Sequence, residues 1–360
     1  MEKKEEQLLI DLTSARGVPG NEEEVREIFK EYAKEFAEDI FFDNLGSVIA
    51  KHTGEGNGPK IFISGHMDEV GFMVTKITEK GFIEFQTLGG WWNQVMLAQQ
   101  VEIKTREGKL IHGVIGSKPP HVLTPEARSK PYDIKEMFID IGASSKEEAQ
   151  EWGIRPGDMI TPYIEYKRLN DSKFLLAKAW DNRVGTAVSL RVLENLAHEG
   201  HPNCLFAGSD VMEEVGLRGA RTSTHIVNPD IAIALDTGTA GDTPGMTPKE
   251  ADSELGKGPQ VLIFDASMIP HKKLLNFVTD TAEDLGIPFQ YTVITGGGTD
   301  AGQMHLTRDG VPSIAITVPV RYLHSHTSVI HEDDYLNTVR LVTEVVRRLD
   351  DETVKEIRSY

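Results

Sequence analysis

The chain has almost no cysteine and a shortage of positive charge. Among its 360 residues Cys204 is the only cysteine, so neither an intrachain disulfide nor a cysteine-rich zinc site can form. The 38 Lys and Arg residues are outnumbered by 56 Asp and Glu residues, which leaves a formal net charge of −18 at pH 7. A field of this sign repels phosphate backbones and anionic lipid, and it therefore disfavours a nucleic-acid partner or a membrane surface.

Long apolar runs are also missing. A membrane-spanning helix needs roughly 18 or more consecutive apolar residues, whereas the best run, residues 311–320, is much shorter and contains two prolines. The first residues, MEKKEEQLLIDL, carry charges of both signs and lack the apolar core and cleavage site of a secretory signal. We therefore expect a cytoplasmic protein that does not cross a membrane.

Helix and strand patterns alternate along most of the chain. Apolar residues recur at helical spacing from Val25 to Phe36, and Asn21 with the glutamates that follow it resembles an N-cap with a capping box. A last helix is expected after Glu332, where three acidic residues suit the positive end of the helix dipole. The other expected helices are 182–198, 217–225 and 272–285, and the expected strands are 40–42, 47–51, 60–64, 204–208, 231–235 and 314–318.

The segment from about Val70 to Tyr166 has a different character. It consists of alternating strand patterns that are broken by Gly, Pro and charged turns, with little helical pattern. We therefore expect an α/β domain built from residues 1–69 and 167–360, interrupted by an inserted β-rich domain at residues 70–166.

Histidines and carboxylates follow several of the buried strands, where a lone charge would be costly. His66 and Asp68 end one apolar run and lie two residues apart, so in extended backbone both side chains project from one face. Asp68 would then hold the imidazole of His66 in one tautomer. A hydrogen-bonded structural pair explains the same pattern, so these two residues alone do not define a site.

More carboxylates lie at the ends of other strands. Asp181 opens an expected helix, Glu213 and Glu214 adjoin each other after a buried strand, and Asp236 follows another. Adjacent carboxylates repel each other unless a cation binds one of them or they lie in solvent. Their side chains also point in different directions, so one could bind a cation while the other moves protons.

Three histidines, His324, His326 and His331, follow the strand expected at 314–318. Two or more histidines and four carboxylates at strand ends match a site for two divalent cations bridged by a carboxylate. Open α/β sheets place their sites at the carboxyl ends of the strands, where all these residues fall. The residues alone do not say which of the three histidines would bind a metal.

Two further motifs are weaker signals. The triple glycine Gly296–Gly298 lacks the Walker lysine and the Rossmann spacing, so we expect a substrate-lining loop, with Asp300 and His305 as candidate neighbours. Trp91 and Trp92 are expected to pack the β-rich domain or its interface.

Taken in order, several segments resemble the tetrahedral-aminopeptidase family of co-catalytic dinuclear metallo-aminopeptidases. The segments are GHMDEVGFM, AWDNRVG, MEEVGLRGA, ALDTG, GGGTDAGQ and VPVRYLHSH. That family includes glutamyl and deblocking aminopeptidases, and some members carry a cellulase or endoglucanase label. The resemblance covers nearly the whole chain, and it implies a mixed-sheet, three-layer metallopeptidase domain with an inserted barrel-like domain.

The resemblance also implies roles for individual residues. His66 and Asp236 would hold one metal ion, Glu214 and His324 the other, Asp181 would bridge both, Glu213 would be the general base, and Asp68 would support His66. The family pattern RYxHS selects His324 over His326, and related enzymes have a cis peptide bond after the bridging aspartate, here Asp181–Asn182.

The implied activity is removal of N-terminal residues from short peptides with a free N-terminus, by a water that two metals activate. Zinc and cobalt are the first candidates for the two divalent ions per subunit, and nitrogen and oxygen ligands also accept manganese. The inserted β-rich domain would mediate assembly of the chain into dimers and then a hollow tetrahedral dodecamer, which admits peptides and excludes folded proteins.

Two alternatives belong to other classes. A glycoside hydrolase of the endoglucanase type would use two carboxylates and no metal, and would have no need of His66 and His324. A metal-binding scaffold would have closed, usually sulfur-rich zinc sites, which leaves Glu213 without a role. The preferred first residue and the native metal stay open; Arg321 or lysines near the site would favour glutamate.

Overall fold

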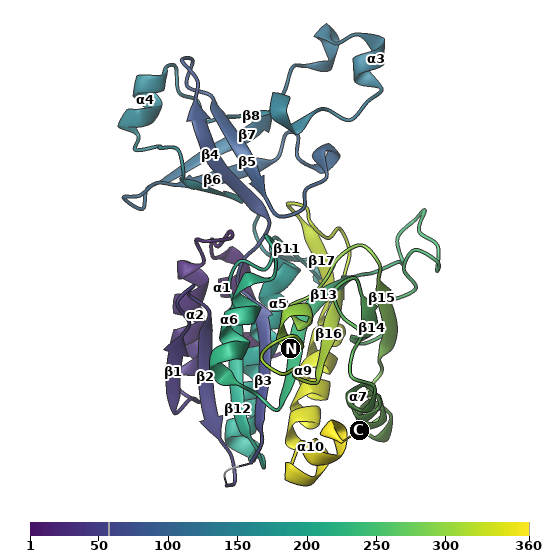
Figure 1. Ribbon diagram of the computed structural model, residues 1–360. Coiled ribbons are helices and arrows are strands. Elements are labelled where there is room, and N and C mark those ends of the chain that lie inside the picture. Colours follow the sequence, from purple (N-terminus) through teal and green to yellow (C-terminus); the bar gives the residue numbers. More distant parts are fainter. Residues whose placement is uncertain (57, 360) are drawn as a thin grey trace.

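A computed structural model of the chain describes residues 1–56 and 58–359. Its largest element is an eight-stranded sheet in the order β1-β2-β12-β3-β13-β16-β14-β15 (Figure 1). The strands are Asp39–Phe42 (β1), Val48–Thr53 (β2), Lys60–His66 (β3), Cys204–Asp210 (β12), Ile231–Thr239 (β13), Gln260–Asp265 (β14), Gln290–Ile294 (β15) and Ser313–Val320 (β16). The four central strands β12, β3, β13 and β16 are parallel, and β2 and β14 flank them in antiparallel orientation, so the sheet is mixed.

Helices cover both faces of this sheet, which gives three layers. One face carries α1 (Lys3–Ser14), α2 (Glu23–Ala33), α5 (Trp180–Glu199), α7 (Lys272–Asp284), α9 (Glu332–Arg347) and α10 (Asp351–Arg358), and the other carries α6 (Arg218–Val227) and α8 (Ala301–Met304). Alternation along β3 explains the arrangement, because Ile61 and Ile63 pack into the core on the first face and Phe62 into the core on the second. A strand covered on both faces must be apolar throughout, and β3 is buried after Lys60.

A closed barrel is inserted between β3 and the short sheet that precedes α5. Its strands in order are β4 (Gly71–Ile77), β5 (Ile83–Leu88), β8 (Phe138–Asp140), β7 (Leu110–Gly116), β6 (Gln100–Lys104) and β9 (Met159–Pro162). The barrel encloses its own core, which includes Phe72, Ile103 and Ile160. Only four residues separate His66 from the start of β4, so the barrel begins at the carboxyl edge of the large sheet (Figure 1).

The remaining elements are short. They are α3 (Pro125–Arg128) and α4 (Lys146–Glu151) beside the barrel, 3-10 turns at Asn93–Val95, Pro120–Val122, Ile134–Glu136 and Leu169–Asp171, and a three-stranded sheet of β10 (Lys167–Arg168), β11 (Phe174–Ala177) and β17 (Ser328–His331). None of the helices in the described part of the chain is long and apolar enough to span a bilayer.

The expected fold class, a three-layer α/β domain with an inserted barrel-like domain, is confirmed. The expected cap of α2 is wrong, because Glu22 occupies the N-cap position without a side-chain cap and its carboxylate accepts from the Gly20 and Met212 amides instead. Helix α1 was not expected from its highly charged sequence, although Leu8, Leu9 and Leu12 form a buried stripe.

Candidate metal centre

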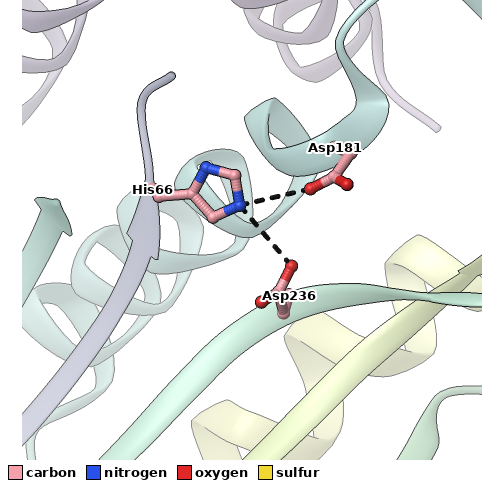
Figure 2. Close-up of side chains that lie close together, drawn as sticks. All are labelled: His66, Asp181 and Asp236. Atoms are coloured by element: carbon pink, nitrogen blue, oxygen red, sulfur yellow. Dashed lines mark ion pairs between the residues drawn. The ribbon is translucent and has the colours of Figure 1, made fainter. Parts of the chain in front are cut away.

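The carboxyl ends of neighbouring strands bring His66 and Asp236 together. Both side chains are buried, and His66 Nε2 lies 3.8 Å from Asp236 Oδ1. Asp181, at the start of α5, points into the same space, with its Oδ1 3.2 Å from His66 Nε2 (Figure 2). One donor atom from each of the three side chains lies within 4.8 Å of the others, which is the spacing of ligands around one cation.

A second group of donors shares Asp181. Its other oxygen, Oδ2, lies 3.3 Å from His324 Nε2, and the same nitrogen lies 3.6 Å from Glu214 Oε2. Donor atoms of Asp181, Glu214 and His324 also fall within 4.8 Å of one another. The two oxygens of one carboxylate therefore face two separate groups, each with one histidine and one further carboxylate.

The backbone around Asp181 explains how its side chain is held. The Asp181–Asn182 peptide bond is cis, as the resemblance implies. The Asn182 amide donates to the Leu235 carbonyl at 2.7 Å and accepts from Gly185 N at 3.0 Å. Since Leu235 directly precedes Asp236, Asn182 ties the first turn of α5 to the strand that carries another member of the cluster.

Asp68 contacts the cluster in two ways. The Nδ1 atom of His66 lies 3.0 Å from the Asp68 carbonyl oxygen and 3.5 Å from its carboxylate. The carboxylate itself accepts from the amides of Glu213 and Glu214, both at 3.0 Å. The main chain of residue 68 thus holds the imidazole, while its side chain holds the backbone of the adjacent glutamates.

Glu213 belongs to neither donor group, although its Oε2 lies 3.8 Å from His66 Nε2. Burial raises the pKa of Glu213 well above its usual range, and the carboxylates of Asp236 and Asp300 add to the effect. A buried carboxyl that binds a proton more readily than usual suits proton transfer.

The protein alone leaves a large excess of negative charge in the centre. Burial raises the pKa of Glu214 to about 8 and that of Asp236 to about 7. Burial opposes protonation of the histidines, yet the carboxylates around them, Glu213 for His66 and Asp181 for His324, raise both pKa values. Oxygen Oε1 of Glu214 is buried and has no hydrogen-bond partner. Divalent cations would satisfy this atom and offset the charge, so the residues fit the metals that the resemblance implies.

The three histidines that sequence alone could not separate have different surroundings. His324 points into the cluster, whereas His331 accepts from Asp333 N as the N-cap of α9. His326 is buried against the ring of Trp91 at a centroid distance of 5.1 Å, and neither of its ring nitrogens has a partner. Burial lowers the pKa of His326 to about 4.

The barrel contributes a residue that sequence reasoning missed. A backbone hydrogen bond with Gly90 is among the causes that raise the pKa of His324 to about 9, after its contacts with Asp181 and Glu214. A methyl group built on Gly90 would lie 3.1 Å from His324 Nδ1. The GGWW motif that contains Gly90 was visible in the sequence, but nothing local placed it against a histidine more than 200 residues later.

Arg183, two residues after Asp181, was also missed. Its guanidinium is fully buried, and it donates to the carbonyls of Leu12, Ala15, Gly17 and Met67 and to the Glu69 carboxylate. Its hydrogen bonds therefore connect the end of α1 and the segment after it with Met67, the residue that follows His66. The available signal was an arginine directly before the uncharged run 184–190 of the helix Trp180–Glu199.

The cluster lies in one wall of a cavity of about 450 Å³. Gly296, Gly297 and Gly298 line this cavity, in agreement with the expectation of a substrate-lining loop. Asp300 is buried beside that loop with no partner for its carboxylate, and His305 Nδ1 contacts the Ala301 carbonyl at 3.0 Å.

An α/β sheet with clustered histidines and carboxylates at its carboxyl edge, and with a barrel inserted in the chain, is the architecture of a metal-dependent aminopeptidase. The M42 glutamyl aminopeptidase family matches residues 46–341, and a family described as AMPT matches residues 3–29. The chain belongs to the M42 glutamyl aminopeptidase family, and it is therefore a peptidase of the aminopeptidase type.

Individual relatives agree with this membership. The glutamyl aminopeptidase of Lactococcus lactis is 38% identical over 97% of this chain and 98% of the relative. The lysyl aminopeptidase of Pyrococcus furiosus is 31% identical over 95% of this chain and 97% of its own length. The crystal structure of a TET aminopeptidase from a marine Thaumarchaeota archaeon superposes with a TM-score of 0.96 at 44% identity, covering 98% of this chain and 99% of the other.

Proposed function

We propose that the protein is a dinuclear metallo-aminopeptidase that removes N-terminal residues from short peptides. His66 and Asp236 would hold one cation, Glu214 and His324 the other, and Asp181 would bridge the two. The observation that carries the proposal is the position of the Asp181 carboxylate, whose two oxygens lie 3.2 and 3.3 Å from the Nε2 atoms of two different histidines.

Two divalent cations in such a site would lower the pKa of a water and polarise the scissile carbonyl. The oxygen and nitrogen donors accept zinc, cobalt or manganese, with zinc and cobalt as our first candidates. The His66 imidazole is held by the Asp68 carbonyl at Nδ1, which leaves Nε2 as the ligand atom.

Glu213 is the proposed general base. It is a carboxylate next to the ligands that is not needed as a ligand, and its backbone amide is held by Asp68 at 3.0 Å. Burial makes its carboxyl a ready proton acceptor, so it would take the proton of the attacking water and return it to the leaving amine.

The acidic wall of the cavity supports exopeptidase action. Asp181, Glu213, Glu214 and Asp236 all line it, and a protonated α-amine is attracted to such a wall. A substrate whose amine is acetylated loses this attraction, whereas an endopeptidase substrate never needs it.

We further propose that residues 70–166 form a separate oligomerisation domain, and that residues 1–69 and 167–360 form the catalytic domain. The barrel exposes large apolar side chains, including Trp92 at 59% and Val122 at 70% of their full surface. Such side chains would be covered in dimers that assemble into a dodecamer, the assembly that we propose for this protein in the cytoplasm. Sedimentation of the purified protein measures the assembly directly.

A glycoside hydrolase is not favoured. That chemistry needs two carboxyl groups across a sugar cleft and has no use for histidines. In this site both histidines touch the central Asp181 carboxylate, and the family is one of peptidases. A scaffold role is also disfavoured by the family.

Replacement of Glu213 by Gln tests the mechanism. The amide cannot accept the proton, so we expect kcat to fall by about 10²- to 10⁴-fold, while both cations stay bound. Metal content per subunit is measured by mass spectrometry beside the hydrolysis of aminoacyl-p-nitroanilides. The matched control Glu254→Gln changes an exposed glutamate and should behave as wild type. Unchanged hydrolysis by Glu213→Gln with full metal content would remove Glu213 from the mechanism.

A second assay separates the classes of enzyme. Protein stripped with a chelator should lose activity on free-amine substrates and regain it after reloading with zinc, cobalt or manganese. N-acetylated substrates should stay intact. Cleavage of soluble cellulose that resists the chelator, with no hydrolysis of peptides, would contradict the proposal.

A further inference from the structure

Beyond the metal centre, the wall of the cavity is electrically neutral. The described residues that line it away from the cluster are glycines, threonines, one serine, one alanine and the three large apolar residues Leu217, Ile294 and Leu323. They include no lysine and no arginine. Leucine and isoleucine side chains supply the large apolar groups, and the glycines leave room between them.

Arg321, the cation that would favour an acidic substrate, is already paired. Its Nε donates to Asp242 Oδ1 at 2.8 Å and its Nη2 to Asp242 Oδ2 at 2.5 Å. Both oxygens of Asp242 therefore meet the planar guanidinium, an arrangement that neutralises the charge and fixes its direction. Arg321 does not line the cavity, although Leu323 and His324, which follow it closely, do.

No carboxylate is available for a basic substrate either. The four acidic residues that line the cavity are Asp181, Glu213, Glu214 and Asp236, and all are assigned to the metals or to proton transfer. Asp300, which follows Thr299 in the chain, is buried and does not line the cavity. A charged side chain that lies against the part of the wall outside the cluster would lose its hydration without gaining a charged partner, which is unfavourable.

We propose that the chain prefers substrates whose first residue is neutral and apolar, such as leucine or methionine, over those that begin with glutamate or lysine. The side chain would lie against Leu217, Ile294 and Leu323. This inference rests on the proposed function, and it separates this chain from the glutamyl and lysyl activities after which two of its relatives are named.

Ile294 is the residue best placed to set this preference. It is the last residue of β15, is partly buried, and lies beside the glycine loop at Gly296–Gly298. A methyl group built on Gly297 would lie 3.5 Å from Ile294 Cγ2, so Ile294 lies directly against the glycine loop. Its neighbour Val293 is 48% exposed and does not line the cavity.

The first test compares four substrates on the metal-loaded protein. The p-nitroanilides of leucine, methionine, glutamate and lysine are hydrolysed under equal conditions, and kcat/KM is measured for each. We expect leucine and methionine to exceed glutamate and lysine by at least about tenfold, the low end of discrimination by an apolar pocket. Glutamate or lysine at or above the value for leucine would overturn the proposal while leaving the aminopeptidase function intact. Absence of hydrolysis on all four would remove the proposed function and this inference together.

A variant pair locates the preference. Ile294→Arg places a cation in the cavity, so the ratio of glutamate to leucine kcat/KM should rise by at least about tenfold. Val293→Arg adds the same charge one residue away but outside the cavity, and its ratio should equal that of wild type. Ile294→Met should keep the order of preference. Equal ratios for Ile294→Arg and Val293→Arg would exclude Ile294 from the pocket. If Ile294→Arg does not fold, Ala266→Arg repeats the test directly after the neighbouring strand β14, at another residue that lines the cavity.

Discussion

Arg183 shows how one buried side chain supports the centre without entering it. Its guanidinium satisfies four backbone carbonyls and shares the Glu69 carboxylate with Lys178, which donates to Glu69 Oε1 at 2.6 Å. Burial lowers the pKa of Lys178 to about 8, although Glu69 opposes the change. Two buried cations thus share one carboxylate, and removal of one member changes the electrostatic environment of the other two.

Replacement of Arg183 by Met should lower the free energy of unfolding by about 3–5 kcal/mol. The change leaves four buried backbone carbonyls without a donor and removes one of the two cations that pair with Glu69. Urea unfolding followed by circular dichroism gives the value. The control Arg340→Met removes an exposed arginine that donates to the Leu285 carbonyl. The free energy of unfolding of this variant should stay within about 0.5 kcal/mol of the wild-type value. A loss below about 1 kcal/mol for Arg183→Met would mean that the buried network contributes little.

The buried carboxyl group of Glu22 should make the stability of the protein depend on pH. Burial raises its pKa to about 7 from a usual value of 4.5, with a contribution from Asp68. The native state therefore binds this proton more tightly than the unfolded chain, and the stabilisation is complete below pH 4.5 and is lost as pH rises through about 7. The loss amounts to at most about 3 kcal/mol.

Glu22→Gln should remove that loss, because the amide oxygen can still accept from Gly20 N and Met212 N but carries no charge. The variant should be more stable than wild type at pH 8, and the difference should vanish near pH 4.5. Unfolding curves at several pH values test this. Glu23→Gln, at the exposed neighbouring position, should follow the wild-type curve; a difference for Glu22→Gln that does not depend on pH would contradict the assignment.

Among the elements, the loop between β5 and β6 matters most for the site. It carries Gly90 against His324 and Trp91 against Phe72 and His326, with the Phe72 and Trp91 rings stacked at 4.7 Å. The indole nitrogen of Trp91 also donates to the Gly71 carbonyl at the start of β4. The barrel thus supports one of the two donor groups in addition to any part it has in assembly.

Gly90→Ala should lower the affinity of the proposed Glu214–His324 site for its cation more than that of the proposed His66–Asp236 site. The added methyl would stand 3.1 Å from His324 Nδ1 and push the ring from its position. A loss of roughly 10- to 100-fold in affinity is typical when such a supporting contact is disturbed, so titration with metal should show one tight and one weak ion per subunit. Gly296→Ala, with nothing within 4 Å, is the control and should bind both ions tightly. Equal weakening at both sites in Gly90→Ala would contradict the selective effect.

At the scale of the whole molecule, the hydrophobic core of the barrel is separate from those of the sheet and its helices. In the described residues the sheet and helices enclose a core on each face of the sheet, and the barrel encloses its own. The proposed metal ligands all belong to the domain of the sheet and helices, so bound metal would stabilise that part of the chain directly and the barrel only through their contact.

Calorimetry should therefore resolve two transitions that respond differently to metal. A cation at about 100 times its dissociation constant stabilises the native state by about 2.7 kcal/mol. Chelation should therefore lower the unfolding temperature of the sheet and helices by several degrees and leave that of the barrel unchanged. Ile103→Ala, in the barrel core, should do the reverse. A single transition that shifts as a whole with metal would show that the two parts unfold as one unit.

Local sequence pattern was sufficient for much of the architecture. Helix α2 and strand β3 were expected within a few residues of their observed bounds, because periodic burial leaves a periodic pattern. The strand-end positions of His66 and Asp236 followed from the same logic, since parallel strands end at one edge of a sheet. Strand β14 and the edge strand β15 were not expected, because exposed apolar residues blur their alternation.

What the pattern could not decide were contacts between residues distant in the chain. His324 and His326 are two residues apart and of one type, yet one points into the metal cluster and the other is buried against a barrel tryptophan. The position of Arg321 was equally out of reach, because it is paired with Asp242 and does not line the cavity although Leu323 and His324 do. Composition and periodicity indicate which positions of a helix or strand are buried. The direction of a side chain and the identity of its partner are settled only when the strands, helices and barrel pack together.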